Sequence, residues 1–462
     1  MESFLDWDAH RLTAALTTRA LSATEVMRAT LERIAQVNPA ANAIVSLRGD
    51  DALMVEAAAA DAGAVKGPLH GVPLAVKDLA NVAGLPTTMG SPALADQIAT
   101  TSDIMVQRMQ DAGAIVIGKT NTPEFGLGSN TFNPLFGITE NALAPGMTAG
   151  GSSGGAAVAL AHRMVCLADG SDMMGSLRNP AGWNGVYGHR PTWGLVPGNA
   201  AGDLFAHPLS TLGPMARCPQ DIALLLDVQA GPDPRLPFGR ASAGFARKLG
   251  ADVTGRRIAW LGDWGGAYPM EAGVLDSAAG ALAHLEASGC TVEPADPPFP
   301  AAALWEAWTT LRAWSVAASL RPLYEDSATR DRLKPEAIWE IERGLALSGQ
   351  EIQRASALRS DWFRATARFF DRFDAFVLPT AQCWPFPADM HWPHEIAGVR
   401  MDSYHRWMEV VIPVSLIGLP CLAVPIPGPR PMGLQIAARQ GNDLGALQLG
   451  AAWHRQIPSS HP

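Results

Sequence analysis

Three short segments of the chain carry residues that could perform nucleophilic chemistry. Lys77 lies in Val76-Lys77-Asp78, at the end of an apolar run. Ser152 lies in the glycine-rich segment 150–155, and Ser176 lies in the segment 170–180. A serine hydroxyl attacks well only when a neighbouring base takes its proton. None of the three segments contains a histidine, so a Ser-His-Asp arrangement finds no support in them.

Each segment also has an ordinary structural interpretation when it is taken alone. A lysine at the end of a buried strand usually extends its ammonium to solvent. A Gly/Ser-rich hexapeptide is usually a turn, and as a phosphate loop it lacks the Gly-Lys-Ser/Thr ending. A serine after a glycine turn, such as Ser176, is most often a helix cap. The case for chemistry therefore depends on the segments occurring together.

Taken together, these segments and several others, in this order, resemble the amidase-signature family. The similarity covers nearly the whole chain. It is carried by Leu69 to Asp78, Gly118 to Phe125, Gly150 to Gly155, Gly170 to Pro180, Leu212 to Arg217 and Pro431 to Gln435. The resemblance implies an α/β fold with a central mixed β-sheet covered by helices on both faces. It also implies one catalytic domain over residues 1–462, with core motifs at 69–217 and a variable, Trp-rich helical region at about 300–375.

The resemblance further implies a Ser–cis-Ser–Lys triad. Lys77 is then the base, Ser152 the proton bridge after a cis peptide bond from Gly151, and Ser176 the nucleophile. A free lysine has a pKa of about 10.4, so Lys77 must be neutral to act, and burial shifts its pKa in that direction. A second hydroxyl can donate and accept at once, which suits Ser152 as a relay.

The residues around the nucleophile have supporting roles in this interpretation. We expect the backbone N–H groups of the four residues from Met173 to Ser176 (Met173, Met174, Gly175 and Ser176) to hold the developing oxyanion. Ser153 and Asp172 are expected to order the loops. Arg178 is expected to pair with a carboxylate inside the protein rather than with the substrate. No metal or organic cofactor is required.

The chain departs from the family pattern beside the nucleophile. Met173 and Met174 stand where the family usually has Thr-Gly. If position 174 needed a positive φ, methionine would be strained there. We favour the alternative, in which the two methionines only add bulk and apolar surface near the acyl site. At least one of them is expected to line the acyl or leaving-group pocket and to favour apolar substrates. The segment Pro208 to Pro214 also departs from the usual Ser-Leu-Asp-Gln-Ile-Gly-Pro, which weakens a match to the amidotransferase subfamily.

The predicted function is hydrolysis of amide bonds in a small, neutral, apolar or aromatic substrate through an acyl-enzyme on Ser176, with ester or carbamate cleavage as side activities. The first alternative is the catalytic subunit of a glutamine-dependent aminoacyl-tRNA amidotransferase. The second is a non-catalytic scaffold that has lost the oxyanion hole. Tryptophans in the helical region 301–375 could wall the pocket, but core packing is the simpler interpretation.

Composition limits the partners. The 462-residue chain is 48% hydrophobic and 17% charged, with a formal net charge of −9 and no Lys/Arg-rich run, so nucleic acid is an unexpected partner. No apolar run reaches the roughly 18 residues of a membrane span, and no signal peptide is recognisable, which predicts a cytoplasmic protein without membrane contact. Five scattered cysteines favour neither disulfides nor zinc. His391 and His394 are expected in a surface loop. A homodimer, frequent in the family, is left open.

Hydrophobic periodicity predicts where the elements lie. Helices are expected at 22–38, 51–64, 104–112, 156–161, 272–288 and 443–454, with further helices over 301–375. Residues 69–78 are expected to form a Gly/Pro turn that leads into a short apolar strand. Further strands are expected at 114–118, 165–168, 257–261, 377–380 and 422–425. Residues 126–155, rich in Gly, Asn and Thr, are expected to form an ordered functional loop, and 170–176 a turn.

Overall fold

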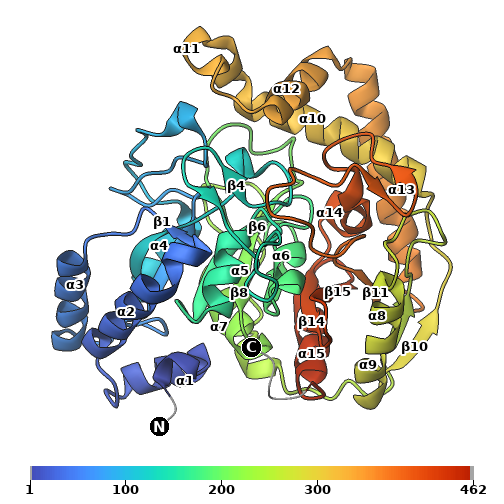
Figure 1. Ribbon diagram of the computed structural model, residues 1–462. Helices are drawn as coiled ribbons and strands as arrows, with labels where there is room; N and C mark the ends of the chain where they lie inside the picture. The colour runs from blue at the N-terminus through green and yellow to red at the C-terminus, as the bar shows by residue number, and fades with distance from the viewer. Residues whose placement is uncertain (1–2, 458–462) are drawn as a thin grey trace.

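A computed structural model describes residues 3–457, and its elements alternate between helix and strand along most of the chain (Figure 1). The strands are β1 (Ile44–Val45), β2 (Pro73–Lys77), β3 (Ile115–Thr120), β4 (Phe132–Asn133), β5 (Gly137–Ile138), β6 (Leu167–Asp172), β7 (Tyr187–Arg190), β8 (Thr211–Ala216), β9 (Arg257–Trp260), β10 (Thr291–Pro294), β11 (Ala375–Pro379), β12 (Glu395–Ile396), β13 (Val399–Arg400), β14 (Cys421–Ile426) and β15 (Met432–Ala438).

The helices pack around the strands. They are α1 (Ala9–Thr17), α2 (Ala23–Ala41), α3 (Asp50–Ala62), α4 (Ile104–Asp111), α5 (Gly154–Ala161), α6 (Arg178–Trp183), α7 (Pro219–Gln229), α8 (Val274–Ala281), α9 (Ala283–Ala287), α10 (Ala301–Glu325), α11 (Ser327–Arg330), α12 (Pro335–Ala346), α13 (Gly349–Phe369), α14 (Ile412–Leu416) and α15 (Asp443–His454). Of these, α6 and α14 are themselves fully buried. Short 3₁₀ turns connect several of the helices.

One mixed sheet organises the described residues. Its 11 strands follow the order β1-β3-β2-β6-β8-β7-β14-β15-β11-β9-β10. β2 runs parallel to both β3 and β6, whereas β6 and β8, and also β14 and β15, are antiparallel. Every residue of β2 and β14 is buried, and such continuous apolar strands are typical of a sheet covered on both faces.

Two separate sets of helices cover the central strands. α5 and α6 pack on each other, in front of the sheet in Figure 1. α5 also packs on β2, β3, β6 and β8, and α6 packs on β7, β14 and β15. α7 packs on β6, β7 and β8 and also on α4 and α15. Both sets of helices thus pack on β7 and β8. The α/β fold class expected from the sequence is therefore confirmed.

Most predicted elements are confirmed, with ends moved by a few residues. α2 begins after Ser22, whose side chain and that of Glu25 form a capping box. Two predictions need correction. Residues 170–172, expected in a turn, continue β6 because they pair with β8. The sequence analysis also missed α1, α7, β7, β8, β10 and β15, of which all but α1 contain glycine or proline. The buried residues of α1, Ala9, Leu12, Thr13 and Leu16, follow helical spacing, so this helix could have been predicted.

The long loop after β3 is ordered by buried amide and hydroxyl side chains. Asn133 Oδ1 accepts the N–H groups of Leu135 and Phe136, and Asn141 Oδ1 accepts those of Leu143 and Ala144. These bonds replace the backbone pairing that a helix or strand would provide. The expectation of an ordered loop is confirmed, and the two-residue strands β4 and β5 pair inside it before α5 begins at Gly154.

The helical region after β10 lies at one side and above the sheet, with α10 and α12 in contact (Figure 1). Of its five tryptophans, Trp308 and Trp362 are fully buried, and Trp305 and Trp314 pack partly buried against the core. Trp339 is 40% exposed. None of the helices in residues 3–457 is long and apolar enough to cross a bilayer.

Candidate active site

Lys77 occupies the last position of β2, and its side chain is buried with 1% exposure. Its Nζ lies 2.8 Å from Ser152 Oγ, 2.9 Å from Ser153 Oγ and 3.0 Å from Ser171 Oγ. A hydroxyl can either accept from an ammonium or donate to a neutral amine. The three hydroxyls can therefore accommodate both protonation states of the lysine.

Burial dominates the protonation of Lys77. Removal from water lowers its pKa to about 7, although the negative charges of Asp169 and Asp172 act in the opposite direction. The direction is the one expected for an ammonium in a low-dielectric site. At neutral pH a substantial share of Lys77 is thus a neutral amine that can accept a proton.

Ser152 is presented by a loop with unusual backbone geometry. The Gly151–Ser152 peptide bond is cis, as the resemblance implied. Two hydroxyls hold the carbonyl groups on either side: Ser129 Oγ donates to the Gly151 oxygen and Thr131 Oγ1 to the Gly150 oxygen, both at 2.7 Å. Ser152 itself is 2% exposed. The Gly/Asn/Thr-rich loop after β3 thus positions the serine that contacts Lys77.

The turn that carries Ser176 is built on a buried ion pair. Asp172, at the end of β6, accepts two hydrogen bonds from the Arg178 guanidinium at 3.0 Å and one from the Leu177 N–H at 3.1 Å. Burial would raise the pKa of Asp172, but the charges of Arg178 and Arg190 lower it to about 2. Arg178 therefore pairs with a carboxylate inside the protein, as expected, and Asp172 fixes the turn.

The methionines at 173 and 174 are not strained, because neither is among the non-glycine residues with positive φ in the described part of the chain. The positive φ of this turn falls on Gly175, at +82°, where a Cβ would also meet Val411 at 3.0 Å. Met174 thus replaces a glycine that the backbone does not require. The alternative favoured from the sequence is confirmed on this point.

One of the four backbone N–H groups that were expected to hold the oxyanion is already used inside the protein. The Gly175 N–H already donates to Asp172 Oδ1 at 2.9 Å, so it is not free for a ligand. The N–H groups of Met173, Met174 and Ser176 donate to nothing within residues 3–457. Free N–H groups in a turn are the usual way to bind a developing oxyanion.

A cavity of about 460 Å³ opens over these residues. Ser152, Ser171 and Ser176 line it together with both methionines. Most of the remaining wall is apolar: Leu79, Met89, Phe125, Leu127, Leu212, Val316, Leu320 and Met408. Among the described residues, Arg312 is the only charged one in the lining. None of the tryptophans lines the cavity, so the alternative in which tryptophans wall the pocket is wrong.

Arg312 is neutralised inside the protein. Its Nε donates to Glu340 Oε1 at 2.6 Å and its Nη2 to the Tyr404 hydroxyl at 2.7 Å. Arg312 and Glu340 are 3% and 0% exposed. The pair joins α10 to α12 behind the cavity wall. The cavity therefore offers no net charge to a ligand.

The two methionines connect the serine turn to α10. Arg312 Nη1 lies 3.3 Å from Met173 Sδ, and Trp308 Nε1 donates to Met174 Sδ at 3.2 Å. Both sulfur atoms accept weakly, and both side chains fill irregular apolar space. Both methionines line the cavity that also holds Ser176. Their effect on the preference for apolar substrates stays a prediction.

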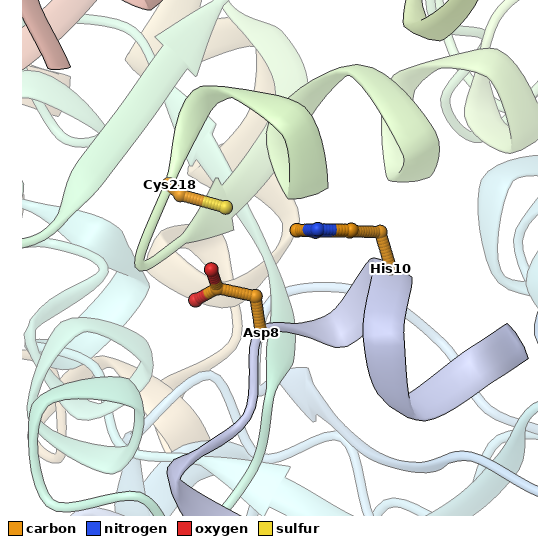
Figure 2. A group of neighbouring side chains, drawn as sticks. All are labelled: Asp8, His10 and Cys218. Carbon is orange, nitrogen blue, oxygen red and sulfur yellow. The ribbon is translucent and has the colours of Figure 1, made fainter. Parts of the chain in front are cut away.

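Potential metal ligands lie elsewhere. His391 and His394 are exposed, as expected for a surface loop. Among the residues described, Asp8, His10 and Cys218 bring ligand atoms within 4.8 Å of one another (Figure 2). Burial raises the pKa of the Cys218 thiol, and Asp221 and Asp8 raise it further. Since metals bind the thiolate, this chemistry does not favour a metal, and we assign none there.

Some contributors to the site were missed in the sequence. Ser171 contacts Lys77, yet it appeared only as one residue of a turn motif. Asp169 accepts the Lys77 N–H and Arg312 borders the cavity, and neither has a local sequence signal. Their roles arise from pairing between β2 and β6 and from the packing of α10, which are tertiary features.

A buried lysine hydrogen-bonded to a serine, with a second serine in the same cavity, is a site suited to a serine hydrolase without histidine. Comparison with known proteins agrees. The family model described as Amidase matches residues 25–447, and the chain belongs to this family. It is 35% identical to an acylamidase of Rhodococcus erythropolis, over 99% of this chain and 97% of the relative.

Two further comparisons bear on function. A glutamyl-tRNA(Gln) amidotransferase subunit from Symbiobacterium thermophilum is 33% identical, over 96% of this chain and 94% of that one. The crystal structure of a bacterial aryl acylamidase superposes with a TM-score of 0.92 at 29% identity, covering 98% of this chain and 97% of that chain. The chain is an amide hydrolase of the amidase-signature type.

Proposed function

We propose that this protein hydrolyses uncharged acylamides, including aryl acylamides, through an acyl-enzyme on Ser176. One observation carries the proposal: Lys77 is buried beside Ser152, and Ser152 shares a cavity with Ser176. The names of the acylamidase relative and of the aryl acylamidase structure support the substrate class. The apolar wall and the internally paired Arg312 also favour uncharged substrates.

In the proposed mechanism, the proton moves along a short relay. Ser176 Oγ attacks the amide carbon while its proton passes to Ser152 Oγ, and the Ser152 proton passes to neutral Lys77. The Ser176 hydroxyl has no hydrogen-bond partner in residues 3–457, so it is free to turn toward Ser152. The same relay then returns a proton to the leaving nitrogen, and the amine departs.

The second half of the reaction repeats these steps with water. Water attacks the ester formed on Ser176, its proton follows the relay to Lys77, and the proton then returns to Ser176 as the carboxylic acid leaves. The N–H groups of Met173, Met174 and Ser176 would bind the oxyanion in both halves, with Gly175 left to Asp172. This reaction needs no cofactor.

We further propose that residues 1–462 act as one catalytic domain on a small molecule in the cytoplasm, without nucleic acid or membrane, and that ester and carbamate cleavage are side activities. The sheet supports the single domain, since its strands come from residues 44 to 438. Formation of a homodimer stays a prediction, and a light-scattering measurement of the molar mass would test it.

The test combines a substrate and a probe. The purified chain should release 4-nitroaniline from 4-nitroacetanilide, and a fluorophosphonate should label Ser176, identified by mass spectrometry of the peptide. An amidotransferase subunit would instead prefer glutamine and depend on partner subunits. The cavity disfavours that alternative, because its one charged residue among those described is already paired with Glu340 and leaves no free charge to balance the α-ammonium or α-carboxylate of glutamine. If the fluorophosphonate does not label Ser176, the proposed function fails and the non-catalytic scaffold is the remaining alternative.

A further inference from the structure

A second carboxylate lies beneath the lysine. Asp169 is the third residue of β6, it is 1% exposed, and its Oδ1 accepts the backbone N–H of Lys77 at 3.0 Å. Strands β2 and β6 pair through Ala75 and Ala168, so the Asp169 side chain takes over as acceptor where the ladder ends. Its Oδ2 has no hydrogen-bond partner within the described part of the chain.

The charged groups around this position lie on β3 and on β6 itself, because β8, which pairs Pro214 with Asp169, carries no charged residue. On β3, the fully buried Lys119 donates to the Ala80 carbonyl and lies 3.6 Å from Asp78 Oδ1. On β6, Asp172 is already paired with Arg178 and Arg190. α5 contributes no charge to this region, only the Ser153 hydroxyl. Two carboxylates act on the charge of Lys77, and of these Asp172 is paired with two arginines, whereas no ion pair with an arginine is found for Asp169 among the described residues.

We propose that Asp169 is a positioning residue for the reaction. Its hydrogen bond fixes the end of β2, and its negative charge sets the fraction of Lys77 that is neutral and able to accept the proton from Ser152. The inference rests on the proposed function, in which Lys77 is the base. It assigns to Asp169 a role in the pH range of the enzyme, not contact with the substrate.

The charges act in a consistent direction. Burial lowers the pKa of Lys77 to about 7, and Asp169 is the first of the two carboxylates that oppose it. Burial also raises the pKa of Asp169, to about 6, while Lys119 and Lys77 favour its ionised form. At a pH between about 6 and 7, Asp169 is mostly ionised, and its negative charge favours the protonated form of Lys77. Without that charge, Lys77 becomes neutral at lower pH.

The test is the pH–rate profile of Asp169→Asn with 4-nitroacetanilide. Asparagine can still accept the Lys77 N–H but carries no charge. We expect the acid limb of kcat/KM to move by about 1 pH unit toward acid, the low end of the effect of one nearby charge. Asp169→Glu keeps the negative charge, so its acid limb should stay closer to that of the wild type than the limb of Asp169→Asn does. Asp169→Ser removes the charge with a smaller side chain and should shift the limb as Asp169→Asn does.

Asp221→Asn is the matched control. Asp221 is equally buried and also accepts backbone N–H groups, those of Ala9 and His10, but it lies on α7. Its profile should stay in place. An unmoved limb in folded Asp169→Asn and Asp169→Ser would overturn the inference, as would an equal shift in the control. If instead Lys77→Met kept wild-type activity, the proposed function itself would fail.

Discussion

The Nζ of Lys77 and the Oγ of Ser152 lie 2.8 Å apart, in a site where the lysine is removed from water. The contact confirms the prediction that Lys77 is buried within reach of Ser152. It also supplies a chemical reason for a lysine where other hydrolases use histidine, because burial brings the lysine pKa to about 7.

Replacement of the proposed nucleophile is the most direct test. Ser176→Ala should reduce kcat with 4-nitroacetanilide at least about a thousandfold, since removal of a nucleophile leaves only binding and oxyanion contacts. The unfolding temperature should stay near that of the wild type. Ser319→Ala, which removes another hydroxyl lining the same cavity, should retain turnover. A Ser176→Ala protein with more than a thousandth of wild-type activity would refute the role.

Activity should rise with pH through about 7. The base must be neutral, and desolvation has lowered the Lys77 pKa to about that value. Below pH 7 the protonated amine cannot accept, so log kcat/KM should climb with unit slope; above pH 7 it should level off. The measurement needs a substrate for which the acylation step is rate-limiting. A profile flat from pH 5.5 to 9 would argue against lysine as the base.

The conformation of the turn around Ser176 should depend on the glycine at position 175. Gly175→Ala places a Cβ at a φ of +82° and 3.0 Å from Val411. A left-handed residue costs about 1–2 kcal/mol, so both unfolding free energy and activity should fall. The control is Gly280→Ala in α8, which is exposed with open space around it. That variant should be neutral or more stable by about 0.5–1 kcal/mol.

Strong helical and strand patterns located most of the fold, and spaced motifs located the three central residues of the site. β14 is an uninterrupted apolar strand, β2 is apolar up to Lys77, and α2 has its capping box, so local sequence was informative there. Asp169 could not be predicted as a partner of Lys77 because the contact follows from the pairing of β2 with β6. The Gly175 N–H was expected to be free, but Asp172 folds back on it, which only the turn geometry reveals.

The ion pair behind the cavity should matter more for stability than an exposed pair on the same helix. Arg312→Gln leaves Glu340 buried without its cation, and breaking a buried pair costs about 3–5 kcal/mol. Arg321→Gln breaks the Arg321–Glu325 pair, whose side chains are more than half exposed, and should cost at most about 1 kcal/mol. Denaturant unfolding of both variants measures the difference. Equal losses would contradict the structural role of Arg312.

Substrate preference should follow the two methionines. In the double variant Met173→Thr/Met174→Gly, Trp308 loses the sulfur acceptor of Met174, and Arg312 Nη1 loses that of Met173. Both changes make the cavity wall more polar and less filled. We expect preference for apolar over small polar acyl groups to fall about tenfold, in line with the 1–3 kcal/mol of a methylene-sized contact. Ser176 should still react with a fluorophosphonate, because neither methionine supports the backbone with a strained φ.

The control for this prediction is Met408→Leu, which keeps an apolar wall of similar size at another point of the cavity and should preserve the ranking of substrates. If the double variant ranks a panel of amides as the wild type does, the methionines only fill space; if it loses probe labelling, they hold the turn.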